Sequence, residues 1–185
     1  MREKILEATA AMLVAHGTQA SMSKIAQRAG VATGSLYNHF ENKDVLIRAV
    51  YDDLAAVMAE ALTAGDDPSQ PALTRLERYI DNHIDFIWQD ADRAVLFEYL
   101  SNVPLLPGAD VMASFEKSAS FIAGVLRQLQ DEGGSIAGDP GVMGGFIGGA
   151  IRNTLKWQRA QGKPLSDETR AQLRDMCLRS VQAGA

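Results

Sequence analysis

Hydrophobic residues recur along this chain every three or four positions, the spacing that places side chains on one face of an α-helix. The clearest stripe, within residues 43–62, consists of Val45, Leu46, Ala49, Val50, Leu54, Val57, Met58 and Ala61. No segment alternates convincingly between apolar and polar residues, as a half-buried strand would. The pattern therefore predicts an all-α protein.

Breaks in the periodicity set the expected ends of about nine helices. The later helices are expected over about 43–62, from 72 onward, about 93–103, about 109–131, from 140 to about 162, and after Ser166. Four residues are predicted to cap helices through side-chain oxygens: Ser21, Asn42, Asp139 and Ser166. Pro104, with Pro107-Gly108, is expected to close the sixth helix.

The pattern of residues 25–40 predicts a short helix, a glycine-containing turn and a second short helix. Ala26 and Ala29 leave room for close approach of the two helices, and Gly30 can adopt the left-handed conformation of a sharp turn. Leu36 is expected to point back into the small core. The segment from about 22 to 40 is therefore predicted to be a helix-turn-helix, whose second helix enters the DNA major groove.

Residues 5–50 closely resemble the DNA-binding domain of the TetR family of bacterial transcriptional repressors. The matching positions run from Ile5 through Gly17, followed by Ile25-Ala26, Ala29-Gly30-Val31, Gly34, Leu36-Tyr37, Phe40, Lys43, Leu46 and Val50. Ala32 departs from the pattern, because the family usually has Ser or Thr there as a cap. Either Thr33 takes over the cap by a one-residue shift, or the cap is lost at a cost of about 1 kcal/mol.

The resemblance implies a three-helix DNA-binding domain over residues 1–46 and a helical effector-binding and dimerisation domain over residues 47–185. In the family, the C-terminal helices typically enclose a small-molecule pocket, and ligand binding tilts the fourth helix. The last two helices usually pair with those of a second subunit.

Polar side chains on and around the second short helix are the candidates for DNA contact. They are Ser23, Lys24, Thr33, Ser35, Tyr37, Asn38, His39 and Lys43. Asn38 is best suited to adenine, whereas Tyr37 and His39 are expected to bind phosphate, as similar positions do in the family. For His39 and Ser23, a solvated helix surface is an equal alternative.

Aromatic and methionine side chains in the C-terminal part could line an effector pocket with mainly apolar walls. The candidates are Tyr79, His83, Phe86, Phe97, Met112 and Phe115. The alternative is that these residues are plain core, which is the commoner role of such side chains at helical spacing.

The expected eighth helix contains Gly144-Gly145 and Gly148-Gly149. Each interior glycine costs about 1 kcal/mol relative to alanine, so a compensating close contact is expected. The resemblance favours a subunit interface over a contact within one subunit. The predicted interface residues are Gly144, Gly148, Ile151, Leu155, Leu173 and Met176.

Composition agrees with a DNA-binding protein of modest charge. The chain has 185 residues and a net charge of −5, but residues 1–50 carry +2 and the remainder −7. A single cysteine, Cys177, suits a reducing cytoplasm, and the chain has neither a run of 18 apolar residues nor the apolar core of a signal peptide near Met1.

The sequence therefore predicts a cytoplasmic, homodimeric transcriptional repressor that binds a palindromic double-stranded operator and is released by a small, mainly apolar effector. No cofactor, metal ion or membrane partner is expected. The three histidines have no metal-ligand spacing, which argues against an enzyme. A helical adaptor for a protein partner, or a ligand-binding protein without an operator, remains the alternative.

Overall fold

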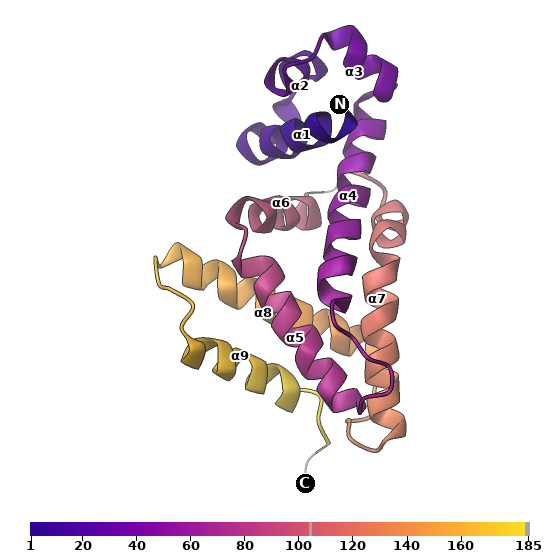
Figure 1. Ribbon diagram of the computed structural model, residues 1–185, viewed down its shortest axis with the longest axis vertical. Coiled ribbons are helices and arrows are strands. Elements are labelled where there is room, and N and C mark those ends of the chain that lie inside the picture. Colours follow the sequence, from indigo (N-terminus) through magenta and orange to yellow (C-terminus); the bar gives the residue numbers. More distant parts are fainter. Residues whose placement is uncertain (104, 184–185) are drawn as a thin grey trace. The chain divides into compact units, whose positions relative to one another are not determined.

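The computed structural model describes residues 1–103 and 105–183, so the end of the sixth helix assigned to Pro104 lies outside the described residues. These residues form nine α-helices and one short 3-10 helix (Figure 1). The elements are α1 (Arg2–His16), η1 (Gly17–Gln19), α2 (Met22–Ala29), α3 (Thr33–His39), α4 (Lys43–Thr63), α5 (Ala72–Trp88), α6 (Ala91–Asn102), α7 (Gly108–Asp131), α8 (Pro140–Ala160) and α9 (Asp167–Arg179). The predicted all-α class is confirmed, since extended pairing among the described residues is limited to one isolated bridge between Ser135 and Gln182.

The four predicted helix caps are confirmed. Ser21, Asn42, Asp139 and Ser166 each accept a hydrogen bond from the backbone N–H three residues further on, at 2.9–3.4 Å. These bonds satisfy donors that the first turn of a helix would otherwise leave without partners. The caps explain why α2, α4, α8 and α9 begin where the sequence indicates.

The start of α3 lacks such a bond. Ala32 occupies the N-cap position, with ψ 142°, and Thr33 is already the first helical residue. The alternative in which Thr33 takes over the cap is therefore wrong. The physical reason is that Leu36 donates its N–H to the Ala32 carbonyl, which fixes the helix one residue before Thr33 could act as a cap.

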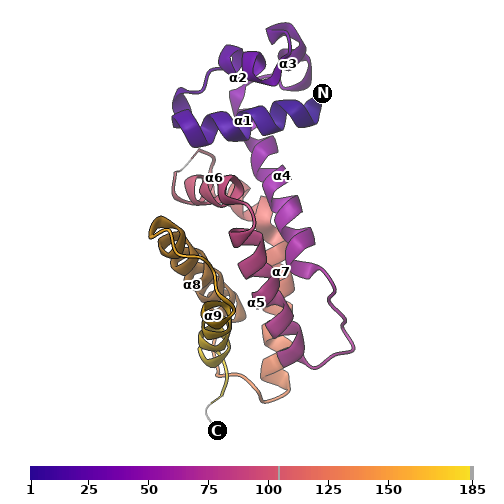
Figure 2. The same cartoon turned by 60° about the vertical axis from the view of Figure 1, so that its left-hand side comes forward.

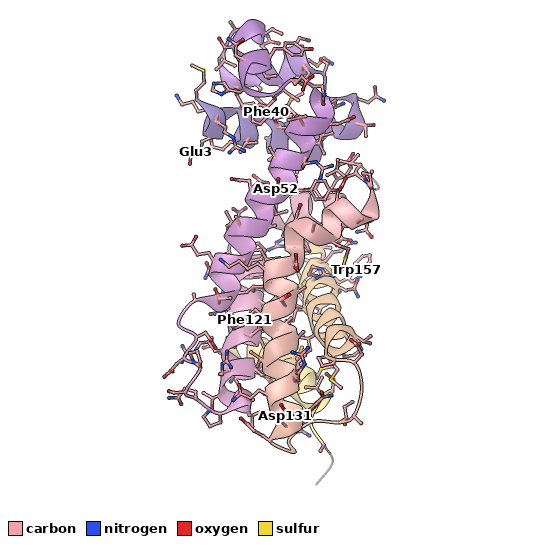
Figure 3. The ribbon with its side chains drawn as sticks, turned by 90° about the vertical axis from the view of Figure 1, so that its right-hand side faces the viewer. Glu3, Phe40, Asp52, Phe121, Asp131 and Trp157 are labelled. Atoms are coloured by element: carbon pink, nitrogen blue, oxygen red, sulfur yellow. The ribbon has the colours of Figure 1, made fainter. Side chains whose placement is uncertain are left out.

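The chain divides into two compact units. The first comprises Met1–Val57 with Ala91–Phe115, so it contains the whole of the predicted 1–46 domain and also α6. In this unit α1 packs against α2 and α6. The fully buried Tyr51 donates its hydroxyl to the Leu100 carbonyl at 2.8 Å, and Asp52, labelled in Figure 3, accepts a bond from Ser114 at 2.6 Å.

The second unit comprises Met58–Asp90 and the described residues from Glu116 onward. In it, α5 packs against both α8 and α9 (Figure 2). Arg159 donates to the carbonyls of Ile87 and Trp88 at 2.9 and 3.1 Å, which satisfies the C-terminal end of α5. Arg174 pairs with Asp81 at 2.8 Å and joins α9 to α5.

Two further properties limit the chemistry of the chain. Burial raises the pKa of the Cys177 thiol to about 11, so the thiol stays protonated at neutral pH. No helix in the described part of the chain is long and apolar enough to cross a bilayer.

Candidate nucleic-acid interface

The turn between α2 and α3 has the geometry that its sequence predicts. Gly30 lies in the left-handed region with φ 67° and ψ 31°. Its N–H donates to the Gln27 carbonyl at 3.1 Å, and the Val31 N–H donates to the Ala26 carbonyl at 3.0 Å. This pair of bonds ends α2 sharply, so α3 leaves in a new direction. This turn could be predicted from the sequence because the residues that form it are neighbours along the chain.

Leu36 holds α3 against the rest of residues 1–46, which we call the head. Its side chain is fully buried, as is that of Ile25. The polar positions of α3 point the other way. Thr33, Asn38 and His39 are exposed, as is 49% of Tyr37, whereas Ser35 is half-buried. One edge of a short helix thus presents several hydrogen-bonding side chains to solvent, as direct contact with base edges and phosphates requires.

The three remaining candidates lie beside this edge but are not equivalent. Ser23 and Lys24 are exposed on the first turn of α2, and the Ser23 hydroxyl lies 3.1 Å from that of Ser21. The Lys43 amino group donates to the Thr18 carbonyl at 2.6 Å. Lys43 therefore has a structural partner, since it ties the start of α4 to η1, and only its remaining N–H groups are available to a phosphate.

Arg2 is a basic residue near this edge that sequence reasoning missed. Its guanidinium lies 5.6 Å from the centre of the Phe40 ring, within the range of a cation–π contact. Phe40 follows α3 directly and is labelled in Figure 3. No local pattern could have found this contact, because 37 residues of sequence separate the two side chains.

The predicted interface residues on α8 and α9 need correction. Gly144, Gly148, Ile151, Leu155 and Leu173 are all buried within the single chain. A Cβ at Gly144 would lie 3.0 Å from Ile122 of α7, and one at Gly148 would lie 3.2 Å from His83 of α5. These glycines therefore serve a close contact within one subunit, and a second subunit cannot reach them without unpacking the core.

The outward face of the same two helices is apolar instead. Its exposed large side chains are Val142 (71%), Phe146 (60%), Trp157 (56%) and, among the predicted interface residues, Met176 (61%). Trp157 is labelled on α8 in Figure 3. Gly145 and Gly149 lie on this side of α8, and a Cβ at either would meet nothing within 4 Å. Large apolar side chains that are exposed together are typical of interaction sites.

The six predicted effector residues separate into two groups. Tyr79, His83 and Phe86 are buried on α5 in the second unit. Phe97 and Phe115 belong to the first unit, where their rings meet edge to face at 5.6 Å. Met112 does not fit a pocket wall, because 69% of it is exposed. We therefore withdraw Met112 from the predicted pocket residues.

His83 is the unusual member of the α5 group. Its ring contacts Tyr79 edge to face at 5.7 Å, and neither ring nitrogen has a hydrogen-bond partner among the described residues. Burial, together with the smaller effect of the positive charge of Arg152, lowers the pKa of His83 to about 3. Burial raises the pKa of Tyr79 to about 12, against the effect of Arg152. Both side chains are therefore neutral at physiological pH.

Comparison with known protein families agrees with both parts of the chain. Residues 5–50 match the family described as bacterial regulatory proteins, tetR family, and residues 69–181 match the tetracyclin repressor-like C-terminal domain. The chain belongs to the TetR family. It is accordingly a transcriptional regulator with a helix-turn-helix domain and a helical C-terminal domain.

Solved structures of TetR-family proteins share the fold over their full length. A TetR-family transcription regulator from Shewanella sp. PV-4 superimposes with a TM-score of 0.89 at 19% identity, covering 99% of this chain and 98% of that one. SmeT, the repressor of the Stenotrophomonas maltophilia multidrug efflux pump SmeDEF, gives a TM-score of 0.74 at 20% identity, covering 100% and 92%. SmeT in complex with triclosan gives 0.73 at 21% identity, with the same coverage.

The TetR-family match to the C-terminal domain extends over both features that the geometry singles out there. Its range, 69–181, includes the buried Tyr79–His83 pair and the exposed apolar face of α8 and α9. The N-terminal match includes the turn at Gly30 and all eight predicted DNA-contact residues.

Proposed function

We propose that this TetR-family regulator is a homodimeric repressor that binds a palindromic DNA operator and is released from it by a small molecule. The observation that carries the proposal is the exposed polar edge of α3, set by the Gly30 turn and the burial of Leu36. The proposed DNA contacts are Ser23, Lys24, Thr33, Ser35, Tyr37, Asn38, His39 and Lys43, to which we add Arg2. Because bacterial DNA lies in the cytoplasm, the proposed location is the bacterial cytoplasm.

Dimerisation is proposed through the outward face of α8 and α9. One head carries little positive charge, since residues 1–50 sum to +2, so a single subunit can neutralise few phosphates. Two heads on one symmetric dimer would read half-sites separated by roughly 34–36 Å or a multiple of that distance. The exposed Phe146, Trp157 and Met176 supply apolar area, and Gly145 and Gly149 permit close approach of a second helix.

Release by an effector is proposed by analogy with SmeT, whose structure with triclosan places a small molecule on the same fold. In energetic terms, the effector must bind the arrangement that cannot span two half-sites more tightly than the arrangement that can. The proposed lining residues are Tyr79, His83 and Phe86, which are buried on α5 within the second unit.

Selection of bound duplexes from a random double-stranded DNA pool tests the operator proposal. We expect a palindrome to be enriched, and its half-site spacing to match one or two turns of DNA. Enrichment of a single, non-repeated site would contradict the dimeric mode of binding. Failure to retain any duplex in dilute buffer would favour the alternative, a helical adaptor or ligand-binding protein without operator binding.

A further inference from the structure

The buried polar atoms of α5 are the part of the molecule that packing does not explain. His83 is 1% exposed, and both Nδ1 and Nε2 lack hydrogen-bond partners within the described residues. A neutral imidazole carries one donor and one acceptor, and leaving such groups buried and unpaired costs about 1–3 kcal/mol. A purely structural position of this kind would be occupied at lower cost by leucine or phenylalanine.

Tyr79 lies one helical turn before His83 and is also buried, with 4% of it exposed. Its ring contacts those of His83, at 5.7 Å, and of Phe121 of α7, at 6.2 Å; Phe121 is labelled in Figure 3. The unpartnered imidazole and the phenol of Tyr79 therefore share one face of α5, among aromatic neighbours.

A positive charge lies beside this pair. A Cβ placed on Gly148 would lie 3.1 Å from Nη1 of Arg152 and 3.2 Å from Cε1 of His83. Because glycine has no side chain, the guanidinium and the imidazole can both lie close to this position. The charge of Arg152 acts on both neighbours, since it favours the neutral form of His83 and the ionised form of Tyr79. Gly148 thus has a specific role, which is to let Arg152 approach the imidazole.

We propose that Tyr79, His83 and Arg152 bind the polar end of the effector, and that this end is a carboxylate on an otherwise apolar molecule. The inference rests on the proposed function as an effector-controlled regulator, and it names the chemical class of the effector.

The chemistry of the three groups selects a carboxylate over other polar ends. A carboxylate only accepts hydrogen bonds, and its two oxygens can take the Tyr79 O–H and one His83 N–H. The positive charge of Arg152 offsets the cost of bringing an anion into an apolar region. An amine would instead face Arg152 with a like charge, and an alcohol would leave part of the donor set unused. The aromatic ring of Phe121 and the side chain of Ile122 suit an apolar body.

The experiment compares binding of matched compounds to the ligand-free protein by calorimetry. The probes are straight-chain carboxylates of about six to twelve carbons, phenylacetate, and the corresponding alcohols and amines. We expect at least one carboxylate to bind about tenfold more tightly than its alcohol and amine. Equal affinity for acid and alcohol, or no binding of any acid, would overturn the inference.

Variants assign the effect to these residues. Tyr79→Phe and His83→Phe each remove polar atoms but keep the ring, and Arg152→Gln removes the charge; each should weaken carboxylate binding about tenfold. Tyr51→Phe is the matched control, because it removes the hydroxyl of a buried tyrosine that already has a partner, and it should leave the affinity unchanged. Unchanged affinity in both His83→Phe and Tyr79→Phe would show that the unpaired atoms merely bind a trapped water.

Operator binding and dimer mass are measured on the same ligand-free samples. A protein that binds its operator but no carboxylate would refute the assigned effector class and leave the proposed regulator intact. A protein that binds carboxylates but no DNA would refute the regulator and leave the anchor chemistry standing.

Discussion

Gly144 and Gly145 are neighbours in α8, yet they face different surroundings. A Cβ on Gly144 would lie 3.0 Å from Cγ2 of Ile122, whereas one on Gly145 would meet nothing within 4 Å. Since adjacent residues of a helix point about 100° apart, one glycine of the pair packs inside the chain and the other lies on the surface with Phe146. The pair therefore allows internal packing and external approach to be tested separately.

Replacing Gly145 with leucine should weaken the dimer and preserve the fold. The side chain fits open space in the monomer, and the helix gains about 0.8–1.0 kcal/mol of intrinsic propensity. In a dimer that pairs this face, however, the new side chain would hold the helices apart. We expect the dimer dissociation constant, measured by sedimentation, to rise about tenfold or more.

Gly144→Leu is the matched comparison. Its side chain would collide with Ile122, and overpacking a core costs about 1–3 kcal/mol, which exceeds the gain in helix propensity. The melting temperature should therefore fall for Gly144→Leu and hold or rise for Gly145→Leu. If Gly145→Leu sediments as a normal dimer, this face of α8 does not form the interface.

Tyr37→Ala should weaken operator binding without unfolding the head. Tyr37 is 49% exposed, so little core packing is lost, whereas loss of one DNA contact costs about 1–3 kcal/mol. Binding to the selected operator is measured at fixed salt, with Val95→Ala, an equally exposed residue on α6, as the control. An affinity unchanged by Tyr37→Ala would remove Tyr37 from the groove.

The DNA-binding head could be predicted because its signals are local. The left-handed Gly30, the cap at Ser21 and the buried Leu36 are each specified within a few residues of where they act. The helix ends were predicted for the same reason. The contact of Arg2 with Phe40 and the bond from Lys43 to Thr18 depend on tertiary packing, which periodicity does not encode.

Most of the predicted interface residues are buried within the chain for a definable reason. The apolar residues of α8 are not confined to one stripe of the helix. The sequence therefore does not indicate which stripe packs against α5 and α7 of the same chain. The more continuous stripe, Gly144, Gly148, Ile151 and Leu155, belongs to the core, and the exposed stripe is displaced from it by one residue. Met112 was mispredicted similarly, since an apolar residue in a helix is not necessarily buried.

The missing cap of α3 offers a stabilising substitution. Ala32→Ser should add an N-cap hydrogen bond, raising the free energy of unfolding by about 1 kcal/mol. Ser21→Ala, which removes the existing cap of α2, should lower it by a similar amount. Both changes are measured by urea denaturation. An equal loss in the two variants would show that Ala32 is required by packing.

Two buried tyrosines should respond in opposite ways to loss of the hydroxyl. Tyr51→Phe breaks the bond to Leu100 and leaves a carbonyl without its partner, so stability should fall by about 1 kcal/mol. Tyr79→Phe removes a hydroxyl that we assign to effector binding, so stability without ligand should hold or rise. A clear loss of stability in Tyr79→Phe, measured without ligand, would mean that its hydroxyl has a structural partner.

His83 should make the protein sensitive to mild acid. Its pKa is lowered to about 3 in the folded chain, whereas an unfolded chain has the ordinary value of about 6.5, so between these values the unfolded state binds more protons. Stability is therefore complete above about pH 6.5 and declines as the pH falls toward 3. At about pH 5 the loss should approach 2 kcal/mol, at about 1.4 kcal/mol for each unit below 6.5.

Because His83→Phe removes the titrating group, its unfolding free energy should change less between about pH 7 and pH 5 than that of the wild type. The carboxylates of Asp67 and Asp110, whose pKa values are lowered by their hydrogen bonds, titrate below this window and do not obscure it. Identical pH dependence in the two proteins would show that His83 reaches solvent or a partner in the folded state.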